Sequence, residues 1–211
     1  MGAARPLSDF DLYVPALLVL AVIMVLFTAA ATLIREVDRR TMTRLVLSRL
    51  STAEMLTAVT VNQVLIGTAA LVLAFGAPWS VGCRTTGPLA AVLAVGALST
   101  IGVVALSVLT AAFLKSTFEL LTVGCFPFFV LMFFSESMFP PPRLQVATLW
   151  GHAVYANDEL PTTPAVRAFG KILSQGAGLG DVAFELAGMA VLTAAYFALG
   201  TWLFRRRHMR G

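Results

Sequence analysis

The run YVPALLVLAVIMVLFTAAATLI (residues 13–34) carries no charged side chain and is followed at once by the highly charged REVDRRTMTRLVLSRL (35–50). An apolar run of this length is sufficient for a helix that crosses about 30 Å of hydrocarbon, because a helix satisfies its backbone polar groups internally. The whole chain is 58% hydrophobic and only 12% charged. These features predict an integral membrane protein built from helices.

Five segments meet this length requirement, near 13–34, 55–79, 89–114, 120–139 and 182–204. The stretch GAPWSVGCRTTGP (76–88) separates the second from the third, and KSTFE (115–119) marks a tight turn before the fourth. The sequence therefore predicts an all-α, polytopic helical bundle that forms one transmembrane domain over 1–211.

The distribution of Lys and Arg predicts the orientation, since cytoplasmic loops carry the excess of these residues. Ten of the fifteen basic residues fall on one side: Arg35, Arg39, Arg40, Arg44, Arg49, Lys115, Arg205, Arg206, Arg207 and Arg210. Five fall on the other: Arg5, Arg84, Arg143, Arg167 and Lys171. We expect the first side, with the C-terminus, to be cytoplasmic and the N-terminus to lie outside a bacterial plasma membrane.

The segment between the first two predicted spans, 35–52, gathers five of the fifteen basic residues and two acids. As a helix, its apolar residues Met42, Leu45, Val46 and Leu50 follow one side, while Glu36, Arg40 and Arg44 follow another. One interpretation is an interfacial helix whose arginines attract anionic lipid. The other is a docking surface for a cytoplasmic partner, because a displacement of this segment would be transmitted to both adjoining spans.

Polar residues inside the spans have two possible roles, close helix packing or the lining of a substrate path. Gly96 and Thr100 form a small-xxx-small pair, which predicts close packing against another helix. Asn62 and Gln63 are expected to face another helix, a partner subunit or a wet path, since an unpaired amide in lipid is costly. Glu119 lies four residues after Lys115, which suggests a surface ion pair, and Glu185 is expected near the outer headgroups. The candidate path residues are Thr60, Asn62, Gln63, Ser99, Thr100, Ser135 and Glu136.

The longest interruption, 140–181, is too long for a structureless loop. In TTPAVRAFGKILSQG (162–176), Thr163 can cap a helix, Pro164 suits its first position and Gly176 can end it. Its apolar residues form one stripe: Val166, Phe169, Ile172 and Leu173. Together with RLQVATLWGHAVYA (143–156), this stretch predicts two short helices, re-entrant or interfacial, that dip into the outer interface.

Several functional classes lack their motifs. The sequence has no G-x-x-x-x-G-K-[ST] phosphate loop, and GAGLGD (176–181) has no Lys and is read as a loop. His152 and His208 fall on opposite sides of the membrane, and no catalytic cluster or nucleic-acid-binding pattern can be assembled. We expect no metal and no directly bound cofactor, and a membrane-embedded enzyme is disfavoured.

The segment REVDRRTMTRLVLSRLSTAEML (35–56) resembles the first cytoplasmic segment of type 2 ABC-transporter permeases, with an acid-x-acid pair, a Thr and spaced leucines. The resemblance continues through DLYVPALLVLAVIM (11–24), FSESMFPPPRLQ (134–145) and LFRRR (203–207). The chain departs from the family pattern at Arg40, Arg49 and the Trp150–Gly151 pair. It begins where the second of the family's six spans would be.

The resemblance implies a membrane subunit of an exporter that has no ATPase motif of its own. A separate ABC ATPase would supply the energy of ATP, a second permease subunit would complete a homo- or heterodimer, and the substrate would be hydrophobic, drug-like or lipid-like. The coupling helix would then present Glu36, Asp38, Arg39, Arg40, Thr41, Arg44 and Leu45 to the ATPase. The alternative is a scaffolding membrane protein that uses the same segment to hold lipid or an assembly partner.

Overall fold

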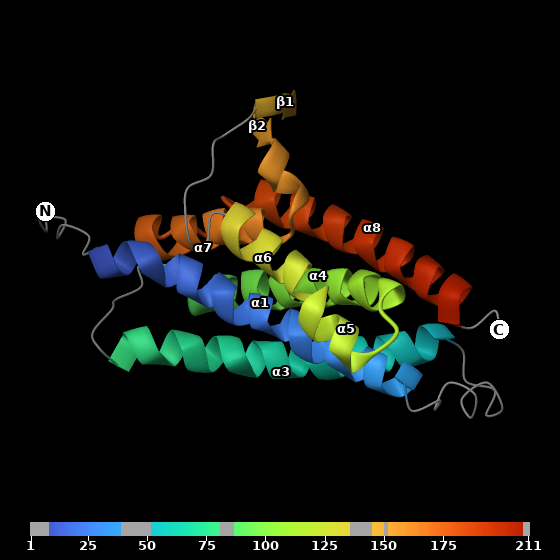
Figure 1. The fold of residues 1–211 in the computed structure, drawn as a ribbon. Coiled ribbons are helices and arrows are strands. Elements are labelled where there is room, and N and C mark those ends of the chain that lie inside the picture. The colour runs from blue at the N-terminus through green and yellow to red at the C-terminus, as the bar shows by residue number, and fades with distance from the viewer. Residues whose placement is uncertain (1–8, 39–51, 81–86, 136–144, 150–151, 209–211) are drawn as a thin grey trace, which may run out of the picture.

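A computed structural model describes residues 9–38, 52–80, 87–135, 145–149 and 152–208. Within these residues, the long helices α1 (Asp9–Asp38), α3 (Thr52–Ser80), α4 (Leu89–Phe113) and α8 (Ala183–His208) lie along one bundle (Figure 1). A further crossing is divided into α5 (Thr117–Thr122) and α6 (Cys125–Phe134). Five segments of this described part are long and apolar enough to span a membrane, so the predicted polytopic helical bundle is confirmed.

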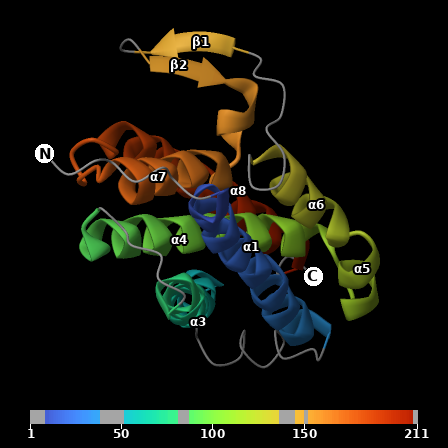
Figure 2. The same cartoon turned by 90° about the vertical axis from the view of Figure 1, so that its left-hand side faces the viewer.

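Helix α4 is the central element of the bundle, and it contacts α1, α3, α7 (Thr162–Gln175) and α8. Figure 2 shows these helices grouped around it. Its sequence explains this position, because small residues recur along the whole helix and allow neighbouring backbones to approach. Gly96, Ser99, Thr100, Gly102 and Ser107 are all buried.

Glycines set the closest helix contacts. A Cβ atom added at Gly67 of α3 would collide with Thr100, and one added at Gly96 would collide with Leu71 of α3. On the opposite side, a Cβ at Gly200 of α8 would lie 2.9 Å from the backbone N of Leu109. The predicted packing role of Gly96 and Thr100 is therefore confirmed, since both meet α3.

The fourth crossing is broken by its own sequence. Pro127 in the first turn of α6 has no N–H, and its ring crowds the carbonyl four residues earlier. A Cβ at Gly124 would collide with the Leu120 carbonyl oxygen, so only glycine fits the link between α5 and α6. The predicted fourth span near 120–139 is thus confirmed as a crossing over Thr117–Phe134, but it is divided at this point, and its predicted end lies outside the described residues.

The start of α5 corrects the expected ion pair between Lys115 and Glu119. The Glu119 N–H donates to Ser116 Oγ (3.2 Å), and the Glu119 carboxylate accepts from the backbone N–H of Lys115 at 2.6 Å. Ser116 therefore caps the helix by accepting from one of its orphan backbone donors, and the Glu119 carboxylate binds the backbone just before the helix, where its negative charge is also favoured.

The segment between the fourth and fifth spans confirms one predicted helix and corrects the other. Helix α7 ends at Gly176, whose φ of 68° is the left-handed conformation that favours glycine. It begins earlier than predicted, after Pro161, and its first turn has no side-chain cap, so Thr163 is not the cap. The buried residues Phe169, Ile172 and Leu173 confirm its predicted apolar stripe.

Residues 143–156 do not form the predicted helix. Strands β1 (Gln145–Leu149) and β2 (His152–Tyr155) pair antiparallel, with Leu149 opposite His152, and the turn η1 (Ala156–Glu159) leads from them to α7. The hairpin stands apart from the helices (Figures 1 and 2). Branched side chains in both strands favour this extended pairing over a helix.

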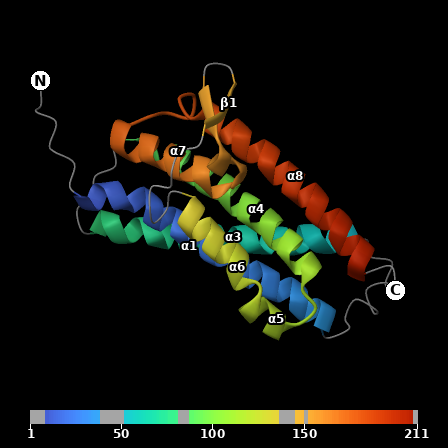
Figure 3. The same cartoon turned by 45° about the horizontal axis from the view of Figure 1, so that its top comes forward.

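Helix α7 enters the bundle to the middle of α4. Pro161 Cβ lies 3.0 Å from the position that a Cβ would take at Gly102, near the centre of α4, while Ile172 meets Gly87 just before α4 begins. Helix α7 therefore runs antiparallel to α4 along the N-terminal half of α4, and Figure 3 shows it beside α1 and α4. Of the two predicted arrangements, re-entrant or interfacial, this depth favours the re-entrant one.

We predict that Gly200→Ala destabilises the protein by about 1–3 kcal/mol, because the added methyl group overpacks the contact between α8 and the α4 backbone. Thermal unfolding in mild detergent, followed by size-exclusion chromatography, measures this loss. Gly188→Ala is the matched control on the same helix, since a Cβ there meets nothing within 4 Å among the described residues. Equal melting temperatures for the two variants would show that the α4–α8 contact tolerates the methyl group.

Candidate functional site

An uncovered aromatic surface lies on α6 and the adjoining side of α1, and we call it the aromatic face. Its phenylalanines are strongly exposed, with 72% of Phe126, 49% of Phe129 and 52% of Phe134 open. The aromatic face comprises Met24, Phe27, Phe126, Phe128, Phe129, Met132, Phe133 and Phe134. It offers apolar contact area together with polarizable rings and sulfur atoms.

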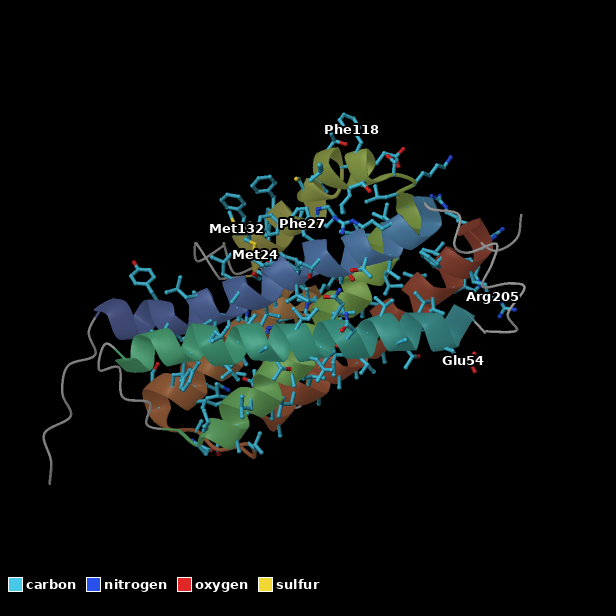
Figure 4. The ribbon with its side chains drawn as sticks, turned by 90° about the horizontal axis from the view of Figure 1, so that it is seen from below. Met24, Phe27, Glu54, Phe118, Met132 and Arg205 are labelled. Carbon is cyan, nitrogen blue, oxygen red and sulfur yellow. The ribbon has the colours of Figure 1, made fainter. Side chains whose placement is uncertain are left out.

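Ring contacts connect α1 to α6 along this face. The Phe27 and Phe128 centroids are 5.1 Å apart with tilted planes, and Phe128 meets Phe129 edge-on at 5.8 Å. Phe129 stacks on Phe133 at 6.1 Å. Figure 4 places Met24 and Phe27 of α1 beside Met132 of α6. These separations are those of favourable aromatic pairs.

The face is open because α6 packs on the bundle through very little of its surface. Leu131 is its one buried residue, whereas α4 is buried over most of its length. The sequence prediction missed the aromatic face by weighing only polar residues as path candidates. The run CFPFFVLMFF (125–134) was the available signal, because no other stretch of the chain concentrates phenylalanine so strongly.

Gln63 faces another helix, as expected. It is 2% exposed, and its Oε1 lies 3.2 Å from the Thr28 hydroxyl of α1. Its Nε2 donates to Thr32 Oγ1 at 3.2 Å. Both ends of the amide are thus satisfied between α1 and α3, and this network cross-links the two helices. Asn62, the preceding residue, lies on the exposed side of α3 instead.

The hydroxyl residues proposed for a substrate path bond to their own helices. Thr60 donates to the Leu56 carbonyl at 2.7 Å, Ser99 to Val95 at 2.7 Å and Thr100 to Gly96 at 2.8 Å. Ser135 donates to the Leu131 carbonyl. The structure does not bring these groups together with Gln63 around one space, and their role in a substrate path stays a prediction.

Most of the predicted coupling segment lies outside the described residues. This holds for Arg39, Arg40, Thr41, Arg44 and Leu45, and also for Glu136 of the predicted path. Glu36 and Asp38 form the end of α1, which continues as a helix to Asp38. The role of this segment therefore stays a prediction.

Two ion pairs fix the re-entrant helix α7. Lys171 Nζ lies 2.6 Å from Glu185 Oε1 of α8, and the Glu185 side chain is 10% exposed. Arg167 NH1 lies 2.7 Å from Asp158 Oδ1 of η1, and the same guanidinium sits 5.1 Å from the Tyr155 ring. Glu185, expected to reach the outer headgroups, is instead turned to a partner inside the protein. These pairs tie α7 to α8 and to the hairpin.

The spans, the helix α7 packed against them and the uncovered aromatic face describe a polytopic helical membrane protein. The family model described as "ABC-2 family transporter protein" matches residues 6–202, and the chain belongs to this family. It is accordingly the membrane subunit of an ABC transporter, and its partner is an ABC ATPase. None of the curated proteins and no solved structure gives a significant match to the chain.

We predict that Lys171→Met loosens α7 by leaving the Glu185 carboxylate unpaired, at a cost of about 1–2 kcal/mol given the partial exposure of Lys171. Hydrogen–deuterium exchange of amides 168–175 should then be about tenfold faster. Adding Glu185→Leu to Lys171→Met removes the orphaned charge and should restore slow exchange. Unchanged exchange in the single variant would mean that apolar packing alone holds α7.

Proposed function

We propose that this chain is the membrane subunit of an ABC exporter that moves a hydrophobic, drug-like or lipid-like substrate outward. The observation that carries the proposal is the aromatic face. An apolar substrate gains contact area there at little entropic cost to the protein, because aromatic side chains have few rotamers to lose. Contact with bulk lipid alone would not require so many aromatic rings on the single short helix α6.

A second copy of the chain would complete the path. The aromatic face is a single wall, and a substrate held on it from the bilayer needs an opposing surface to be kept away from water. In this scheme two permease chains, as a homodimer or with a related subunit, face one another across the path. Two ATPase subunits on the cytoplasmic side drive the change in arrangement.

ATP hydrolysis would reach the bundle through the segment 35–52. This segment joins α1 directly to α3, and the Gln63 network with Thr28 and Thr32 links these same helices. A displacement imposed by the ATPase would therefore move α1 and α3 together. Because α1 also carries Phe27, such a displacement would change the aromatic face. Coupling of this kind requires that the ATPase contact at the segment 35–52 and the substrate contact at the aromatic face both shift the same equilibrium between two arrangements of the helices.

We predict that Phe129→Ala combined with Phe133→Ala lowers export about tenfold, because two rings are lost from the contact surface. ATP-dependent uptake of a hydrophobic dye by inverted membrane vesicles measures this activity. Both positions are exposed, so no internal cavity forms. Leu73→Ala is the control, since Leu73 is 76% exposed on α3, away from the aromatic face. Equal export by both variants would remove the aromatic face from the path.

We predict that charge reversal at the coupling segment, Glu36→Lys with Arg40→Glu, uncouples the ATPase while leaving the protein folded. The expected result is loss of ATPase co-purification and at least a tenfold fall in ATP-driven export. Arg205→Glu, which changes an exposed charge outside this segment, should retain both. Full export by the double variant would contradict the coupling role and favour a scaffolding protein.

A further inference from the structure

The ends of α4 and α8 that lie next to the α5 turn carry a compact aromatic and basic surface. Arg207 of α8 lies over the Phe113 ring of α4, 4.7 Å from its centroid, and Arg206 lies 5.3 Å from the Trp202 centroid. Both rings are about half exposed, Phe113 at 52% and Trp202 at 55%. Each guanidinium thus lies over an aromatic ring at a distance within the range of a cation–π contact.

The arrangement has a fixed geometry. Gly200 meets the α4 backbone at Leu109, which lies one helical turn before Phe113. The neighbouring residues Val108, Ala112 and Phe204 are buried in one apolar cluster. The two helices are therefore closely packed near Phe113. Arg207 of α8 reaches across this contact to the Phe113 ring of α4.

An apolar stripe leads away from the two guanidinium groups along α8. Leu199, Trp202 and Arg206 follow helical spacing on one side of α8, and Leu199 is 46% exposed. The surface therefore has an apolar strip at membrane depth that ends in two positive charges. This shape matches an amphiphile with one acyl chain along the strip and an anionic headgroup at its end.

We propose that this surface is a binding site for an anionic phospholipid. The headgroup phosphate accepts hydrogen bonds from Arg206 and Arg207, and the upper part of an acyl chain lies on Trp202 and Leu199. The charge complementarity identifies a phosphate, and the adjoining exposed rings identify a lipid rather than a soluble anion. A protein partner outside the membrane would also bind the charges, but it would not reach the exposed side chains along the spanning part of α8.

Arg205 provides the internal comparison. It belongs to the same run of three arginines and is exposed at the C-terminal end of α8 (Figure 4). In the part of the chain that the structure describes, its guanidinium lies over no ring and forms no ion pair. A diffuse electrostatic attraction would use all three arginines equally, whereas the proposed site uses two.

The test is native mass spectrometry of the full chain in mild detergent, with phosphatidylglycerol or phosphatidylcholine added. Wild-type protein should retain phosphatidylglycerol in preference. Arg206→Gln with Arg207→Gln should weaken its binding about 25-fold, since each arginine near an anionic headgroup contributes a factor of about five. Arg205→Gln should change binding less than about twofold, and Trp202→Leu, with all charges kept, should weaken it about threefold.

Three outcomes would overturn the proposal. Equal losses for Arg205→Gln and for either single variant, Arg206→Gln or Arg207→Gln, would show diffuse surface charge only. Full displacement of the lipid by inorganic phosphate would show a site for a free anion. Unchanged lipid binding together with lost ATPase co-purification in the double variant would show a protein-docking surface. The variant in which lysine replaces both arginines is the folding control. It keeps both charges, so it should elute normally and retain phosphatidylglycerol, which shows that the loss in the glutamine variant is not caused by misfolding.

Discussion

Close backbone approach at α4 is the constraint on which the rest of the bundle depends. In lipid the hydrophobic effect hardly drives one apolar helix onto another, so association relies on packing and on interhelical hydrogen bonds. Helix α4 meets α3 at Gly67 and Gly96, α8 at Gly200, and the start of α7 at Gly102. At each of these contacts a methyl group would meet a neighbouring side chain or the backbone itself. The small residues of α4 therefore fix where its neighbours can lie.

The same constraint explains why the hydroxyl groups of α4 do not form a polar path. Ser99, Thr100, Ser107 and Thr110 each donate to a carbonyl three or four residues earlier. A hydroxyl bonded in this way costs little to bury and has a small volume, so it serves close packing. The longer amide of Gln63 cannot satisfy itself within its own helix. It is bonded to Thr28 and Thr32 of α1 instead, which makes it a link between helices.

The sequence was sufficient to predict the spans, because about twenty apolar residues have few alternatives to a membrane-spanning helix. It also predicted α7, whose apolar stripe and terminal Gly176 are local signals. The sequence prediction was wrong at the hairpin. The apolar residues of 143–156 led to the prediction of a helix, although Val146, Thr148 and Val154 favour strands. The partners of Gln63 and Glu185 and the place of the aromatic face depend on how distant segments pack. Periodicity within one helix contains no information of that kind.

Packing is distributed unevenly over the molecule, and this has a consequence for motion. Moving α4 relative to α8 would break the contact at Gly200 and the buried cluster around Phe204, whereas moving α6 disturbs one buried side chain, Leu131. The helix is already interrupted at Gly124, three residues before Pro127, so a shift of α6 breaks no continuous helix. Rearrangement of a folded bundle costs least where the fewest contacts are lost. Most of the aromatic face lies on α6, which has few buried contacts to lose, whereas α4 and α8 are held together by close packing.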